Sequence, residues 1–148
     1  MHTDPAFLFD LDGTLVDSVY QHVLSWREAL DAQGIKLSVW RIHRKIGMSG
    51  GLFTNQLLRE TGAEINQERV ELLQQSHAEA YARRAQTVCP LPGACELLSW
   101  LTDARIPWAI ATSGRMQTAR VGLDTLRVDP KRVPVITRDV VSLCQARP

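Results

Sequence analysis

The sequence predicts an α/β fold, in which a doubly wound parallel sheet carries an inserted α-helical module. A short apolar run at residues 6–9 ends at an acidic residue, as expected for a parallel strand that is buried on both faces. Helical periodicity follows, and from residue 90 onward strand-like and helix-like segments alternate. Such alternation is typical of a parallel sheet with right-handed crossovers. We therefore expect residues 1–16 and 89–148 to form the core and residues 17–88 to form the helical module.

The helices of the inserted module are predicted from apolar residues at helical spacing. The first runs from about Val16 to Gly34. The next two each show one apolar face, formed by Val39, Ile42 and Ile46 and by Leu52, Phe53 and Leu57. In the last helix we expect Asn66 as N-cap and a hydrophobic staple between Ile65 and Val70. Its apolar stripe consists of Val70, Leu73, His77 and Tyr81, so His77 is expected to be packed and not a ligand.

The second half of the core is predicted from four shorter segments that follow Pro92-Gly93. In order, they are a helix at 94–104, a strand at 108–112, a helix at 116–126 and a strand at 133–137. Ser113-Gly114 is the expected turn between the first of these strands and the helix after it.

Composition excludes several classes of protein. The chain has 148 residues, 45% of them hydrophobic, and a net charge of +1, so no nucleic-acid partner is implied. Its three cysteines are odd in number and lack CxxC spacing, which argues against a disulfide framework or a zinc site. No apolar run is long enough to span a membrane, and the N-terminus has no signal-peptide pattern. We therefore expect a cytoplasmic protein that does not bind membranes.

Polar residues follow two of the predicted strands. Asp10-Leu-Asp12-Gly13-Thr14 comes after the first, and Thr112-Ser113-Gly114 comes after the strand at 108–112. In open parallel sheets, ligands bind beyond the carboxyl ends of the strands. An ordinary acidic turn and a calcium loop are the alternatives, but a calcium loop has its glycine at the sixth position and follows a helix. The apolar strand in front of Asp10 favours a catalytic site.

These residues carry a resemblance to a known family. Residues 7–18 (Phe-Leu-Phe-Asp-Leu-Asp-Gly-Thr-Leu-Val-Asp-Ser) resemble the first signature of the haloacid dehalogenase-like (HAD) phosphatases, and Ala111-Thr-Ser-Gly114 resembles the second. The helical insert is similar to the cap of the phosphoglycolate phosphatase and β-phosphoglucomutase branch. The resemblance extends from about Ala6 to about Asp139 and implies a Rossmann-like core with a helical cap.

The resemblance implies a mechanism and a set of site residues. Asp10 would be the nucleophile that forms an aspartyl-phosphate, and Asp12 the general acid and then the general base. Mg²⁺ would be held by Asp10 and by the backbone carbonyl of Asp12, while Ser113 and the amide of Gly114 would bind the phosphoryl oxygens. Because Asp12 can protonate an alcohol leaving group, the expected substrate is a small phosphorylated metabolite. Arg44, Lys45, Gly47 and Met48 lie where related caps present their specificity loop, and an ordinary basic helix end is the alternative interpretation of these residues.

The sequence departs from the family pattern after Asp139. The lysine of a Lys-Pro-x-Pro-Asp signature and a later acidic pair are missing, so the core is expected to be incomplete at its C-terminus, with the first strand at an open edge of the sheet. A phosphatase is the main interpretation. A phosphomutase and a truncated, catalytically silent relative that binds phosphate or a partner stay open as alternatives.

The last seven residues are also compatible with a shifted reading frame. A parent reading Val-Arg-Tyr-Ala-Lys-Pro-Asp-Pro-Asp from position 141 can be encoded so that one inserted base gives Val-Ser-Leu-Cys-Gln-Ala-Arg-Pro and then a stop codon. That product matches residues 141–148. We therefore expect that the gene carries the missing lysine signature in another frame downstream of codon 141. The alternative is a natural domain that simply ends here.

Overall fold

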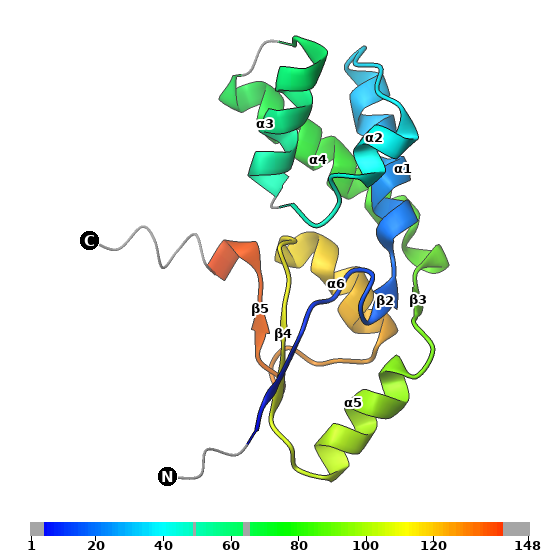
Figure 1. Cartoon of the computed structure of the whole chain (residues 1–148), viewed down its shortest axis with the longest axis vertical. Helices are drawn as coiled ribbons and strands as arrows, with labels where there is room; N and C mark the ends of the chain where they lie inside the picture. Colours follow the sequence, from blue (N-terminus) through cyan, green and yellow to red (C-terminus); the bar gives the residue numbers. More distant parts are fainter. Residues whose placement is uncertain (1–4, 49, 64–65, 141–148) are drawn as a thin grey trace, which may run out of the picture. The chain divides into compact units, whose positions relative to one another are not determined.

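The computed structural model describes residues 5–48, 50–63 and 66–140 (Figure 1). Ile65 of the predicted staple and the segment 141–148 lie outside the described residues. The chain divides into two compact units. We call residues 1–18 with 88–148 the sheet unit and residues 19–87 the helical unit. The boundaries expected from the sequence, after residues 16 and 88, differ from these by two residues and one residue.

As far as its residues are described, the sheet unit is organised by a parallel sheet of three strands. It consists of β1 (Phe7–Phe9), β4 (Trp108–Ala111) and β5 (Val135–Ile136), in the order β1-β4-β5. Helix α5 (Ala94–Asp103) precedes β4, and α6 (Met116–Thr125) connects β4 to β5. Both connections step in the same direction across the sheet, so right-handed crossovers place α5 and α6 on one face, as Figure 1 shows. The predicted parallel α/β arrangement is confirmed.

The prediction that β1 is buried on both faces was wrong, because Phe7 and Leu8 point to opposite faces and both are exposed. Phe7 and Phe9 stack on each other with ring centroids 5.9 Å apart, and Ile110, paired in register with Phe9, is fully buried. Side chains alternate between faces along a strand, so Leu8 and Ile136 lie on the opposite face, where both are exposed. Within the described residues β1 pairs only with β4 and therefore lies at an edge of the sheet, as expected from the sequence.

A second, two-stranded sheet marks the point where the chain leaves and re-enters the sheet unit. Val16–Asp17 (β2) pairs antiparallel with Cys89–Pro90 (β3). The predicted start of a helix at about Val16 was therefore wrong. Val16 is fully buried and would touch any side chain placed at Gly122 of α6, so its backbone stays extended and α1 begins only at Val19.

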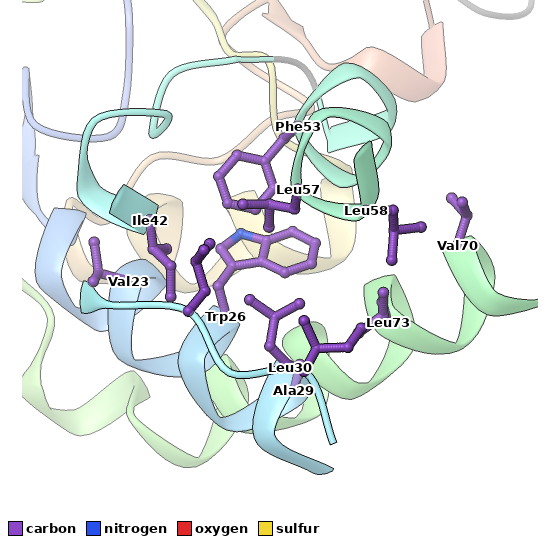
Figure 2. Packing of buried hydrophobic residues seen from close by; sticks show 12 residues of the cluster. Val23, Trp26, Ala29, Leu30, Ile42, Phe53, Leu57, Leu58, Val70 and Leu73 are labelled. Atoms are coloured by element: carbon purple, nitrogen blue, oxygen red, sulfur yellow. The ribbon is translucent and has the colours of Figure 1, made fainter. Parts of the chain in front are cut away.

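In the described residues of the helical unit, the structure has four α-helices and one 3-10 turn. Their bounds are α1 Val19–Ala32, α2 Val39–His43, α3 Gly50–Thr61, α4 Gln67–Arg83 and η1 Ala85–Thr87. Figure 2 shows their shared core, in which the indole of Trp26 contacts Phe53 with ring centroids 4.5 Å apart. Leu57, Leu58 and Leu73 are fully buried around it. Within the described ranges, none of the helices combines the length and apolar character that crossing a membrane requires.

Helix α4 confirms the local predictions made for it. The side chain of Asn66 accepts a hydrogen bond from the Arg69 backbone N–H at 2.7 Å, which is the geometry of an N-cap. Val70, Leu73, His77 and Tyr81 are all buried. The His77 ring stacks on Trp26 at 4.1 Å between centroids, and its Nε2 lies 3.1 Å from Nδ1 of His22, so His77 is packed as expected.

Candidate active site at the carboxyl edge of the sheet

A tight turn follows β1 and holds the first pair of acidic residues. The carbonyl of Leu11 accepts hydrogen bonds from the backbone N–H groups of Thr14, Leu15 and Val16 at 3.3, 2.9 and 3.2 Å. Gly13 has φ 76°, a left-handed conformation that side-chain-bearing residues rarely adopt, and its N–H donates to the Val16 carbonyl at 2.9 Å. The turn therefore fixes Asp10 and Asp12 immediately beyond the carboxyl end of the strand.

Asp10 presents its carboxylate at this edge. The residue is exposed to solvent, and Thr14 Oγ1 lies 3.5 Å from its Oδ2. Partial burial of the carboxylate raises its pKa above 3.8, a hydrogen bond from the Leu11 backbone opposes this, and the neighbouring charge of Asp12 raises the pKa further. The two carboxylates thus concentrate negative charge beyond β1, which is an environment that favours a bound cation.

Asp12 is held more firmly than Asp10. It is half-buried, and its Oδ1 accepts a 2.6 Å hydrogen bond from the hydroxyl of Ser18, which is fully buried. This donor orients the Asp12 side chain. Ser18 was not predicted as a site residue, although it closes the stretch of sequence that resembles the first signature.

The second loop follows β4, the strand that pairs with β1. The Thr112 backbone N–H donates to the Ile136 carbonyl at 2.9 Å, and its buried hydroxyl accepts a hydrogen bond from the Gly114 N–H at 3.0 Å. Ser113 is exposed. The Gly114 amide, expected as a phosphate donor, is thus engaged by Thr112 in this structure and would have to exchange that acceptor for a phosphoryl oxygen. Thr112 lies at the same edge and was not among the predicted site residues.

Two residues that follow β5 form hydrogen bonds with this loop and with the start of α6. The Arg138 N–H donates to the Gly114 carbonyl at 3.0 Å, and the Asp139 carboxylate accepts from the Met116 N–H at 2.8 Å, in the first turn of α6. Burial lowers the pKa of Arg138 below its ordinary value, and the nearby charge of Arg115 lowers it further. These contacts set the position of residues 113–115, and no local sequence pattern indicates them.

The donor set at this edge suits a hard divalent cation in part. Carboxylate and carbonyl oxygens are the ligands that Mg²⁺ prefers, and the repulsion that raises the pKa of Asp10 would be relieved by a positive charge beside it. Asp10, through its carboxylate, and Asp12, through its backbone carbonyl, are the residues that would hold it. In the part of the chain that the structure describes, no group of three or more His, Cys, Asp or Glu residues is arranged to bind a metal.

The basic residues of the helical unit named from the sequence have partners of their own. Lys45 forms an ion pair with Glu60, and the guanidinium of Arg44 lies 5.7 Å from the ring centroid of Trp40. Gly47 has φ 95° and, like Met48, is exposed. Contact of these four residues with a substrate stays a prediction beside the alternative of an ordinary basic helix end.

Comparisons of the sequence with a family model and with a curated protein both indicate a family of hydrolases. A family model described as haloacid dehalogenase-like hydrolase matches residues 5–148. Hexitol phosphatase A of Escherichia coli (strain K12) is 38% identical over 117 residues, which cover 78% of this chain and 51% of that protein. The chain therefore spans about half the length of this curated relative.

Solved structures show the same fold. A hydrolase from Pseudomonas syringae is 53% identical, with a TM-score of 0.86, over 90% of this chain and 61% of that one. CbbY from Rhodobacter sphaeroides, solved in complex with phosphate, is 19% identical and has a TM-score of 0.78, over 95% of this chain and 66% of that one. The first likeness extends to sequence, whereas the second is one of fold alone.

Proposed function

This chain belongs to the haloacid dehalogenase-like hydrolase family, and from that membership we propose that it is a Mg²⁺-dependent phosphohydrolase of a small phosphorylated metabolite. The observation that carries the proposal is the turn after β1, which presents Asp10 to solvent and holds Asp12 two residues further on through Ser18. The name of the relative hexitol phosphatase A supports a phosphate ester of a small polyol as the first substrate class to test.

The proposed reaction has two displacements. An Asp10 carboxylate oxygen attacks phosphorus, the bond from phosphorus to the ester oxygen breaks, and Asp12 donates a proton to the departing alkoxide. Water then attacks the aspartyl-phosphate, Asp12 takes its proton, and inorganic phosphate leaves with the Asp10 carboxylate restored. Mg²⁺, held by Asp10 and the Asp12 carbonyl, would neutralise charge between the carboxylate and the phosphate.

The remaining residues would orient the phosphoryl group. The hydroxyls of Ser113 and Thr112 and the Gly114 amide follow β4 at the same edge, where donors stabilise charge that develops on phosphoryl oxygens. The helical unit would act as the cap that excludes bulk water and selects the leaving group. The placement of these loops beyond adjacent parallel strands supports the first role, and the family pattern alone supports the second.

Hydrolysis of p-nitrophenyl phosphate with and without Mg²⁺ tests the proposal. We expect Mg²⁺-dependent turnover that Asp10→Asn abolishes and that beryllium fluoride inhibits. Asp17→Asn is the matched control, because Asp17 is exposed on β2 and has no part in the proposed site. A folded protein with no Mg²⁺-dependent turnover would refute the activity and favour a catalytically silent relative, while full activity of Asp10→Asn would refute the nucleophile.

A further inference from the structure

An open, solvent-accessible cavity of about 970 Å³ lies in the sheet unit at the amino edge of the sheet, opposite the edge that carries Asp10. Its wall is formed by the residues that lead into β4 and β5 and by the last turns of α5 and α6. Leu98, Ile106 and Val133 supply apolar surface, and Trp108 adds an indole ring. The Trp108 Nε1–H donates to Thr102 Oγ1 at 3.1 Å, which fixes the orientation of the ring.

Two arginines in an unusual backbone conformation line this cavity. Arg105 (φ 57°) and Arg127 (φ 58°) are the non-glycine residues with positive φ in the described part of the chain. Each follows the C-cap residue of its helix, and the next N–H bonds back to a carbonyl of the last turn: Ile106 to Leu101 and Val128 to Leu123, both at 2.9 Å. Glycine is the residue that usually occupies this position, because a side chain is disfavoured there.

The charged residues that line the cavity carry a net charge of +1. Arg132 is a third lining arginine and is highly exposed, whereas the lining acids are Asp103 and Asp129. Asp129 accepts a hydrogen bond from the Lys131 N–H at 2.9 Å and lies 3.8 Å from Arg132 Nε. Three guanidinium groups against two carboxylates therefore leave a net positive charge beside an apolar wall and an aromatic ring.

We propose that this cavity binds a small organic phosphate with an aromatic ring, of about the size of a nucleotide. Arg105 and Arg127 would bind the phosphate, because guanidinium groups form paired, charge-assisted hydrogen bonds with it. The indole of Trp108 and the apolar wall would receive the ring. Both arginines are exposed, and both line the same cavity. The site lies away from Asp10 and does not depend on the proposed reaction.

Cys95 provides a reporter inside the cavity. It is a free, exposed thiol and one of the lining residues. In a Cys89→Ser/Cys144→Ser background, its alkylation by uncharged iodoacetamide can be followed in EDTA with adenosine 5′-monophosphate or adenosine. We expect the nucleotide to slow alkylation in a saturable manner and adenosine to have little effect, because adenosine lacks the phosphate. Failure of the nucleotide to protect Cys95, or equal protection by adenosine, would overturn the proposal.

The decisive variant is Arg105→Gly/Arg127→Gly. Glycine suits both backbone positions, so the melting temperature should be maintained or raised while the phosphate ligands are lost. We expect the half-protecting nucleotide concentration to rise about tenfold or more. The control is Arg120→Gln, which removes a charge on α6 that pairs with Asp124 and is not part of the cavity wall. Unchanged protection in the double glycine variant would overturn the proposal, as would equal loss of protection in the control.

Discussion

Replacement of Asp139 by alanine should destabilise the sheet unit by weakening the start of α6. The Asp139 carboxylate accepts a 2.8 Å hydrogen bond from the Met116 N–H. Met116 lies in the first turn of α6, where backbone N–H groups have no acceptor within their own helix. Loss of such a cap costs about 0.5–2 kcal/mol, and the interaction of a carboxylate with the helix dipole accounts for about 0.3–1 kcal/mol. Because Asp139 is exposed, we expect a loss of about 1 kcal/mol.

Urea unfolding followed by far-UV circular dichroism measures this loss as a lower midpoint at an unchanged slope. Asp139→Asn keeps an acceptor but not the charge, so it should lose less than alanine. Asp124→Ala is the matched control, because Asp124 is an exposed acid near the other end of the same helix, paired with Arg120, and its loss should cost about 0.5 kcal/mol or less. Equal midpoints for Asp139→Ala and Asp124→Ala would refute the assignment of Asp139 as a cap of α6.

Two further predictions concern Asp10 and the core of the helical unit. The folded-state pKa of Asp10 is raised above 3.8 by burial and by Asp12, so ionisation costs stability as the pH rises through that raised pKa. Asp10→Asn should therefore raise the midpoint of urea unfolding more at pH 7.5 than near pH 4. An equal increase in the midpoint at both pH values would contradict this. Leu73→Ala should cost about 2–5 kcal/mol because Leu73 is fully buried. Leu72→Ala, at a neighbouring position that is 47% exposed, should cost about 0.5 kcal/mol or less by the same measurement.

Features that depend on nearby residues could be predicted from the sequence. The apolar run of β1, the apolar stripe of α4 and its N-cap at Asn66 each follow from short-range periodicity or from one side chain bonding three residues ahead. The parallel arrangement of β1 with β4 follows from the alternation of strands and helices. Asp10 and Asp12 could be placed at the carboxyl edge for the same reason.

Features that depend on distant partners could not be predicted. Strands β2 and β3 contain two residues each, too few for a period-two pattern to be visible, and each is defined only by the other. The cap that Asp139 supplies to α6 joins residues that are 23 positions apart. The bond between Gly114 and Thr112 is local, but it depends on the backbone path of the loop, which the composition of the turn does not specify.

The pairing of β2 with β3 makes the whole helical unit the loop of a hairpin. Asp17 and Cys89 are cross-strand partners, and Gln21 Nε2 donates to the Thr87 carbonyl at 3.2 Å, so the ends of the unit are fastened together while it is folded. If the helical unit unfolded, pairing of β2 with β3 would have to close a loop of about seventy flexible residues. Compared with closure of a two-residue turn, this adds an entropic cost of about 3 kcal/mol. A mutation in the core around Trp26 would therefore weaken the β2–β3 pairing through chain entropy alone. Conversely, a short Asn-Gly turn between Asp17 and Cys89 would be enough, in geometric terms, to close the sheet unit without its insert.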